Sequence, residues 1–282
     1  DGISDKHKIS GTIYSLNSNH TNLLKNIFPL YLKSNPLHPD SFPCLRKMEL
    51  DVIKMTLSLF NGDHNSVGCV TAGGTESILL ACKAYSNLGK TRNIYYPEMI
   101  VPMTVHAAFD KAADYYNIKI IKVPVDKDTD LPDMDYIKAS INSNTVLIVG
   151  SAPGYPHGII DPIEELSEIC LKNNIGLHVD CCLGGFILPF LEMEELFDFR
   201  LKGVTSISAD LHKYGNGPKG VSILMYSNRE LMKHQYFVQD EWMGGIYATS
   251  TTLGSRSGNN IALSWATMMH YGFNGYKENA TN

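Results

Sequence analysis

Residues 145–182, TVLIVGSAPGYPHGIIDPIEELSEICLKNNIGLHVDCC, decide the fold of this chain. The first and the last eight residues are largely apolar runs, which is typical of strands that are buried on both faces. Between them, residues 161–174 carry apolar side chains at helical spacing. A strand, a helix and a second strand in this order predict a crossover connection and a mainly parallel sheet.

The same alternation extends outward from about residue 70. We expect the fold class to be α/β, with helices on both faces of the sheet. Residues 1–70 differ, because residues 28–60 read as an extended, proline-punctuated segment followed by one amphipathic helix. Further helices are expected at 75–88, 106–117 and 132–141, and further strands at 98–102, 118–125, 204–210 and 221–227.

Composition narrows the class of protein. The 282 residues are 44% hydrophobic and 19% charged, with a net charge of −5, which is enough apolar material for a sizeable core and gives no basic footprint for nucleic acid. The partner is expected to be a small molecule or another subunit. Six cysteines without a C-x-x-C pair predict free thiols in a reducing compartment and no metal site. The apolar run at 186–191 is far shorter than the roughly 20 residues that cross a bilayer, and the first ten residues lack the apolar core of a signal peptide.

The segment TAGGTES, residues 71–77, places two glycines and a hydroxyl directly before a predicted helix. Free backbone N–H groups and the helix dipole at such a place favour a phosphate. The alternative is an ordinary glycine turn in which Thr75 caps the helix. No G-K-[ST] follows and no G-x-G-x-x-G is present, so the segment is neither a nucleotide P-loop nor a dinucleotide fingerprint.

Two further polar side chains stand at strand ends, where chemistry collects in folds of this class. His106 opens a helix, where an imidazole can cap the helix, pack as a half-buried ring or stack on a flat ligand. Asp180 ends an apolar strand, so we expect a cationic or hydrogen-bonding partner for its carboxylate. Its alternative role is to cap the turn that follows.

The segment SADLHKYGNGPKG, residues 208–220, sets a lysine at the end of another predicted strand. Lys213 in a poorly solvated pocket would have its ammonium form disfavoured, which suits an amine that forms an imine. The alternative is a lysine that reaches solvent from the strand end. His212 and the hydroxyl of Ser208 are candidates for a phosphate site.

Taken together, these features match the requirements of pyridoxal phosphate. This cofactor needs an anchor for its phosphate, a planar partner for its ring, a carboxylate beside its pyridine nitrogen and a Schiff-base lysine. The chain resembles the sphingosine-1-phosphate lyases, in the decarboxylase-like branch of the fold-type I pyridoxal phosphate enzymes. The resemblance covers nearly the whole chain, and its most specific motifs are GCVTAGGTESILLACKAY (68–85), HAAFDKAA (106–113), HVDCCLGGF (178–186) and GVTSISADLHKYG (203–215).

The resemblance implies a role for each site residue. Lys213 would carry the cofactor, Asp180 would pair with the pyridine nitrogen, and His106 would stack on the ring. Tyr14, Asn35 and His38 would face the substrate, with Tyr14 and Lys213 as candidates for proton transfer. The cofactor phosphate would be held by Gly73, Gly74, Thr75, Ser208 and His212, and by Gly254 and Ser255 of a neighbouring subunit, which makes the protein an obligate homodimer.

The implied reaction is the retro-aldol cleavage of a phosphorylated sphingoid base to a long-chain aldehyde and phosphoethanolamine. A pyridoxal phosphate amino-acid decarboxylase of the same branch is the alternative, although the stretch NPLHPD, residues 35–40, favours the lyase. A scaffold that has lost activity is a third reading, against which the intact Lys213, Asp180 and His106 argue.

The resemblance also implies a domain organisation and a location. Residues 1–70 would contribute to the active site and the dimer, and residues 71–282 would form the large cofactor-binding domain. The small C-terminal domain of the family would be missing. The catalytic part is expected in the cytosol, and the full-length protein would be anchored in the endoplasmic reticulum membrane by a segment absent here.

Overall fold

The computed structural model describes residues 11, 13–14 and 18–281. Its centre is a seven-stranded sheet with the strand order β1-β7-β6-β5-β4-β2-β3. Strands β3, β2, β4, β5 and β6 run parallel to one another, whereas β7 pairs antiparallel with both β6 and β1. The strands are β1 (Val67–Thr71), β2 (Glu98–Pro102), β3 (Lys119–Val123), β4 (Thr145–Ser151), β5 (Gly176–Asp180), β6 (Val204–Ala209) and β7 (Ser222–Tyr226).

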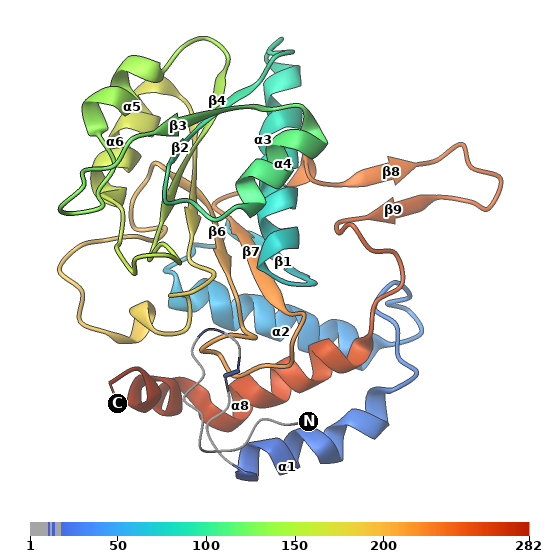
Figure 1. Ribbon diagram of the computed structural model, residues 1–282. Coiled ribbons are helices and arrows are strands. Elements are labelled where there is room, and N and C mark those ends of the chain that lie inside the picture. Colours follow the sequence, from blue (N-terminus) through green and yellow to red (C-terminus); the bar gives the residue numbers. More distant parts are fainter. Residues whose placement is uncertain (1–10, 12, 15–17, 282) are drawn as a thin grey trace.

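Helices cover both faces of the sheet, and each face has its own apolar core (Figure 1). One core takes side chains from α3 (Gly74–Thr91), α4 (Ala108–Tyr116) and α7 (Arg229–Lys233). The other takes them from α2 (Pro43–Leu59), α5 (Met134–Ser140), α6 (Ile163–Asn173) and α8 (Gly258–Thr281), the last of which is broken at Gly272. The expected α/β class, with a mainly parallel sheet between two helical layers, is confirmed.

The amino-terminal part lies beneath this body. Helix α1 (Ser18–Ile27) contacts α8 and continues into the short helix η1 (Phe28–Tyr31). The segment that follows, residues 32–42, is made of turns, so the prediction of an extended segment is wrong there. Helix α2 then packs against α8, β1 and β7. The expected domain division at residues 70 and 71 falls inside β1, which is an edge strand of the sheet.

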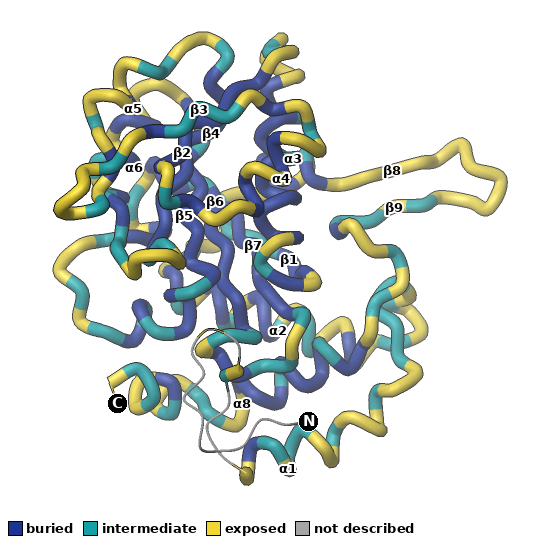
Figure 2. The backbone as a smooth tube through the Cα atoms, viewed as in Figure 1, coloured by how far each residue is buried: buried dark blue, intermediate teal, exposed yellow. Residues whose placement is uncertain are grey.

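A β-hairpin projects from this body between α7 and α8, and both of its strands, β8 (Phe237–Gln239) and β9 (Tyr247–Thr249), extend away from it (Figure 1). Much of the hairpin is exposed (Figure 2), including the large apolar side chains of Trp242, Met243 and Ile246. The sequence analysis did not anticipate this hairpin, because its strands are short and lack a clear alternation of apolar and polar residues. It also did not identify α1, β1, α7 or α8.

The elements that position the site agree closely with expectation. Strand β2 occupies residues 98–102 as predicted, and the predicted strand and helix at 145–152 and 161–174 are β4 and α6 (Ile163–Asn173). Strands β2 and β4 each pair with a strand on either side, so their residues are buried within the sheet. The boundaries of these strands therefore follow the apolar runs of the sequence. Within the described part of the chain, no helix is long and apolar enough to cross a membrane.

Candidate active site

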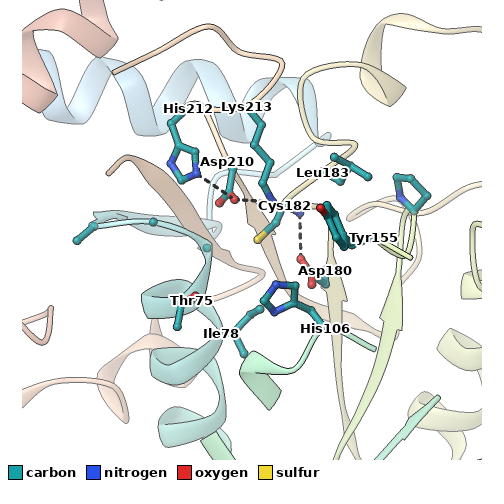
Figure 3. A pocket seen from close by; sticks show the side chains of 14 residues that line it. Thr75, Ile78, His106, Tyr155, Asp180, Cys182, Leu183, Asp210, His212 and Lys213 are labelled. Atoms are coloured by element: carbon teal, nitrogen blue, oxygen red, sulfur yellow. Dashed lines mark hydrogen bonds and ion pairs between the residues drawn. The ribbon is translucent and has the colours of Figure 1, made fainter. Parts of the chain in front are cut away.

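The loops at the carboxyl ends of β1, β2, β4, β5 and β6 enclose a cavity of about 320 Å³ (Figure 3). This volume lies at the lower end of the range for small-molecule sites. His106, Tyr155, Asp180 and Lys213 line it together, although they are far apart in the sequence. The lining residues are Ala72, Gly73, Gly74, Thr75, Ile78, His106, Pro153, Tyr155, Asp180, Cys182, Leu183, Asp210, His212 and Lys213.

The amino terminus of α3 forms one wall. Gly73, with a φ of 130°, is the N-cap residue, and no side chain caps the helix, so the alternative in which Thr75 is the cap is wrong. The first N–H groups of a helix have no partner within the helix, and Gly74 and Thr75 both line the cavity. A Cβ atom at Gly74 would lie 2.7 Å from Asp210 Oδ2 and 2.8 Å from Cys182 Sγ. Only glycine therefore fits between the helix terminus and these side chains.

His106 precedes α4 and fills one of the roles that the sequence left open, that of a cap; the residue is exposed, so it does not pack as a half-buried ring. Its Nδ1 accepts a hydrogen bond from the backbone N–H of Ala108 at 3.1 Å, which caps the helix and fixes the ring. The ring also contacts that of Tyr155 edge-on, with 6.4 Å between centroids. The imidazole is thus held at the cavity with its orientation set by the helix end (Figure 3).

Asp180 ends β5 and is buried. Its Oδ1 accepts hydrogen bonds from the backbone N–H of Cys182 at 3.0 Å and from the hydroxyl of Ser208 at 3.2 Å. The expected partner is therefore a set of hydrogen-bond donors, and the turn-capping role is filled by the same carboxylate. The bond from Ser208 crosses between strands in register, since Asp180 and Ser208 are paired residues of β5 and β6, whereas the bond from Cys182 comes from the turn after β5.

A buried polar network continues from Asp180 into the sheet. The Ser208 hydroxyl lies 3.1 Å from Nε2 of His178, whose Nδ1 lies 2.7 Å from the Ser206 hydroxyl. Ser206 in turn contacts the hydroxyl of Tyr85 from α3 at 2.7 Å. Burial lowers the pKa of His178 to about 4, so its imidazole is neutral at pH 7. Ser208, which we expected at the phosphate site, is fully buried in this network and does not line the cavity.

Lys213 lies in the turn after β6, and its ammonium is 2.9 Å from Oδ2 of Asp210. Burial lowers the pKa of Lys213, but the Asp210 carboxylate opposes burial and the net direction is upward. The expectation that the pocket would disfavour the ammonium form is therefore wrong, because the sequence analysis took no account of Asp210 as a counter-ion.

His212 stands beside the glycine cradle. Its Nδ1 accepts the backbone N–H of Val221 at 3.1 Å, which leaves Nε2 to carry the proton, and Nε2 lies 3.6 Å from Asp210. A Cβ atom at Gly73 would lie 3.4 Å from the His212 ring. The imidazole is thus adjacent to the amino terminus of α3, where the resemblance places the cofactor phosphate.

Three polar residues of this cavity were not predicted from the sequence, namely Tyr155, Cys182 and Asp210. The sequence did contain a signal for Asp210, because this residue stands three positions before Lys213 within SADLHK. A tight turn after a strand brings residues at this spacing together, as the ion pair between Asp210 and Lys213 shows. Tyr155 lies in the long connection after β4, where no spacing rule points to the site. Cys182 read as an ordinary buried thiol.

The remaining predicted residues divide into two groups. Tyr14 lies near the cavity, since the charges of Lys213 and Asp210 both act on it, and its ring stacks edge-on against Tyr214 with centroids 5.0 Å apart. Burial raises the pKa of Tyr14. Asn35, His38, Gly254 and Ser255 do not line the cavity.

Two of the residues outside the cavity, Asn35 and Ser255, nevertheless contact each other. The side-chain amide of Asn35 donates to the Ser255 hydroxyl at 3.0 Å, and its carbonyl oxygen accepts the backbone N–H of Arg256 at 3.2 Å. Arg256 also pairs with Glu49 of α2 at 3.0 Å. The turn segment before α2 and the loop before α8 are therefore hydrogen-bonded to each other. Both segments lie outside the cavity that Lys213 lines.

A family model described as the pyridoxal-dependent decarboxylase conserved domain matches residues 7–282. The chain belongs to this family. The predicted cofactor, pyridoxal phosphate, is thereby confirmed.

Individual relatives of this pyridoxal-dependent protein are sphingosine-1-phosphate lyases, which confirms the resemblance seen in the motifs. Sphingosine-1-phosphate lyase 1 of Rattus norvegicus is 52% identical over 96% of this chain and 48% of its own length. The lyase of Saccharomyces cerevisiae is 47% identical over 96% of this chain and 47% of its own length. The chain thus spans about half the length of the curated relatives it matches.

Solved structures agree. A sphingosine-1-phosphate lyase of Burkholderia pseudomallei superposes with a TM-score of 0.93 at 40% identity, covering 96% of this chain and 65% of the other. A glutamate decarboxylase of Lactobacillus brevis has a TM-score of 0.83 at 24% identity, covering 94% and 63%, and shows the shared fold alone.

The residues present fit pyridoxal phosphate. The glycine cradle at the amino terminus of α3 offers unpaired N–H groups, Asp180 offers a buried carboxylate held by hydrogen bonds, and Lys213 offers a primary amine. His106 supplies a ring beside the same cavity. Each chemical group that the cofactor requires therefore has a counterpart within one cavity.

Asp161 lies behind this site and provides a test of its electrostatics. It is buried, and its Oδ2 accepts the backbone N–H of Ser151 at 2.7 Å. Burial, and secondarily the charge of Asp180, raise the pKa of Asp161 to about 6 from its usual 3.8. Because the pKa of Asp161 is higher in the folded than in the unfolded protein, the protonated carboxyl favours the folded state. This contribution to stability is fully present at a pH below the unfolded pKa of 3.8, and it is lost as the pH rises through the folded pKa of about 6.

We therefore predict that Asp161→Asn gains stability over the parent as pH rises. The amide accepts the same hydrogen bond but carries no charge, so the difference in free energy of unfolding between variant and parent should change by roughly 3 kcal/mol from pH 4 to pH 7. Urea denaturation across this range measures the difference. A difference that does not vary with pH would contradict the assignment.

Proposed function

We propose that this protein is a sphingosine-1-phosphate lyase that cleaves phosphorylated sphingoid bases to a long-chain aldehyde and phosphoethanolamine. The observation that carries the proposal is the identity of about one residue in two with proteins of that name along nearly the whole chain. The cavity supports it, because Lys213, Asp180 and His106 meet there.

In this proposal, pyridoxal phosphate, when bound, supplies an electron-accepting ring that stabilises the electron pair left on the substrate when its Cα–Cβ bond breaks. The amine of Lys213 would bind the cofactor and later move a proton to the substrate Cα. Asp180, held by Cys182 and Ser208, would keep a proton on the pyridine nitrogen. His106, whose ring is fixed by the α4 terminus, would pack on one face of the cofactor.

The backbone N–H groups of Gly73, Gly74 and Thr75 would bind the cofactor phosphate, together with the imidazole of His212. This arrangement uses the unpaired donors and the positive end of the α3 dipole. Tyr14 would exchange the proton of the substrate C3 hydroxyl, whose loss drives formation of the aldehyde carbonyl. Burial raises the pKa of Tyr14, so its phenol is protonated at rest; as it accepts the C3 proton it would pass its own phenolic proton to the Lys213 amine.

We further propose that the active site is completed in a homodimer. Asn35 and Ser255 are hydrogen-bonded to each other but lie outside the Lys213 cavity, as expected if they, with His38 and Gly254, serve the cavity of a second copy. The projecting β8–β9 hairpin supports this proposal, because Trp242, Met243 and Ile246 leave large apolar side chains uncovered.

The domain roles follow from the same proposal. Residues 1–70 would contribute Tyr14, Asn35 and His38 to the active sites and to the dimer, and residues 71–282 would form the cofactor-binding domain. We also propose a cytosolic location for this catalytic part. The six cysteines are all free thiols, which is the usual state in a reducing compartment.

We predict that the loaded protein converts sphingosine 1-phosphate into a long-chain aldehyde and phosphoethanolamine, and that it leaves free sphingosine unchanged. An exposed histidine, His38, would form a charge-assisted hydrogen bond with the substrate phosphate that the free base cannot make. Mass spectrometry of the products and kcat/KM for both substrates provide the measurement.

His38→Ala should lower kcat/KM for the phosphorylated base by about tenfold or more, with no change in the cofactor absorbance. Carbon dioxide released from an amino acid, in place of the aldehyde, would support a decarboxylase. Equal turnover of the phosphorylated and free bases would refute recognition of the phosphate.

A shared site predicts complementation between two inactive proteins. Lys213→Ala removes the cofactor amine, and Asn35→Asp introduces a charge that repels the substrate or cofactor phosphate, so each homodimer should be nearly inactive. A mixed dimer would contain one cavity in which both residues are intact. After the two variants are unfolded together and refolded, activity should return to about a quarter of the parent value, whereas sites built within one chain would give no recovery.

A further inference from the structure

Asp210 is a buried carboxylate for which the roles proposed above provide no task. It follows β6, is 2% exposed and contacts three parts of the cavity. Oδ2 lies 2.9 Å from Lys213 Nζ and 3.6 Å from His212 Nε2. Oδ1 is buried and has no hydrogen-bond partner in the described part of the chain. A carboxylate in this position depends on the neighbouring cations for its compensation.

The backbone holds this geometry. The N–H of Lys213 donates to the carbonyl of Asp210 at 3.3 Å, which closes a tight turn and puts the two side chains on one side of it. The carboxylate also packs against the first residue of α3, because a Cβ atom at Gly74 would lie 2.7 Å from Oδ2 and 2.9 Å from Oδ1. Asp210 is therefore fixed between the lysine and the glycine cradle.

Several charged or titratable groups act on the Lys213 amine. Asp210, Cys182 and Asp180 favour its charged form, and burial opposes it. Lys219 and His212 face it as like charges when protonated, and Tyr14 faces it from the amino-terminal segment. Of these groups, only Asp210 forms a direct ion pair with Lys213 among the described residues.

We propose that Asp210 is the positioning residue for cofactor capture: it holds the Lys213 amine charged and in place at the cavity until the cofactor aldehyde arrives, and then keeps the Nε2–H of His212 as its neighbour. The proposal rests on the assignment of pyridoxal phosphate to this cavity. It concerns loading of the cofactor and not the cleavage of any substrate.

The step balances as follows. The lysine ammonium gives up one proton, its nitrogen lone pair bonds to the aldehyde carbon, and the carbonyl oxygen leaves as water while one proton returns to the nitrogen. The products are a protonated C=N bond and water, with no redox change. Because the ammonium itself cannot attack, the strength of the Asp210 pair sets the pH at which capture proceeds.

After capture the carboxylate keeps a second partner. His212 carries its proton on Nε2, since Nδ1 accepts the backbone N–H of Val221, and that proton faces Asp210. Burial lowers the pKa of His212, and the charge of the Asp210 carboxylate opposes this effect. The Nε2–H of His212, beside the glycine cradle, is also placed to donate to the cofactor phosphate. One carboxylate thus couples the two ends at which the cofactor is held.

The test is the rate of cofactor capture by the protein stripped of its cofactor, followed by the rise of visible absorbance from pH 6 to pH 10. Pyridoxal phosphate and pyridoxal are used in parallel, because pyridoxal lacks the phosphate and reports on the lysine alone. Lys213→Ala supplies the blank for reaction at other amines. No sphingoid substrate is present, so the result does not depend on the lyase proposal.

In Asp210→Asn the midpoint of the capture profile should move to lower pH with both aldehydes. The ratio of the rate at pH 7 to the plateau rate should rise about tenfold, the effect of losing one charge-assisted hydrogen bond. Asp198→Asn is the matched control, because Asp198 is also buried and paired with an arginine, Arg200, at 2.8 Å, but lies outside the cavity. Its midpoint should equal that of the parent.

A variant whose rate falls equally at every pH, with an unchanged midpoint, would show that Asp210 only supports the turn, and would overturn the proposal. So would a shift seen with pyridoxal phosphate but not with pyridoxal. A parent protein that captures neither aldehyde would contradict the cofactor pocket itself, and this inference with it.

A second measurement needs no variant and covers the case in which Asp210→Asn does not fold. The stripped parent is labelled with trace acetic anhydride at a series of pH values, with acetyl-lysine amide as an internal standard, and labelling of each lysine is measured by mass spectrometry. Lys213 should become reactive at higher pH than the standard. Reactivity at a lower pH than the standard would refute the role of Asp210.

Discussion

Two buried carboxylates at adjacent strand ends impose the main constraint on this structure. Asp180 ends β5, and Asp210 follows β6 two residues beyond the partner of Asp180 in the sheet. Negative charges in a poorly solvated place are costly unless they are compensated. Asp180 is compensated by hydrogen bonds, and Asp210 by the ammonium of Lys213. Lys213 and His212 stand beside Asp210, and the amino terminus of α3 packs against the same carboxylate.

The parallel sheet creates this arrangement. The carboxyl ends of β4, β5 and β6 lie side by side, so residues from three distant segments reach one cavity. The network behind Asp180, which passes through Ser208, His178 and Ser206 to Tyr85, fixes the carboxylate by linking two strands to α3. The same network explains how polar side chains are accommodated in the centre of an otherwise apolar sheet.

Much of this could be predicted from the sequence, because apolar runs of strand length and glycine before a helix are local signals. Lys213, Asp180, His106 and the glycine cradle were found in this way, and the structure brings all of them to one cavity. What could not be predicted depends on distance in space. The net charge preference of Lys213 is set by Asp210, and the buried position of Ser208 is set by the pairing of β5 with β6. The β8–β9 hairpin was missed because its short strands pair only with each other.

The central claim is that Lys213 is the residue that binds pyridoxal phosphate covalently in this cavity. The most direct measurement is reduction of the loaded protein with borohydride, followed by digestion and mass spectrometry of the peptides. The account predicts a phosphopyridoxyl adduct on Lys213 and on no other lysine, although Lys219 lies close enough for its charge to be felt at Lys213. An adduct on Lys219, or a loaded protein with no adduct on Lys213, would contradict it.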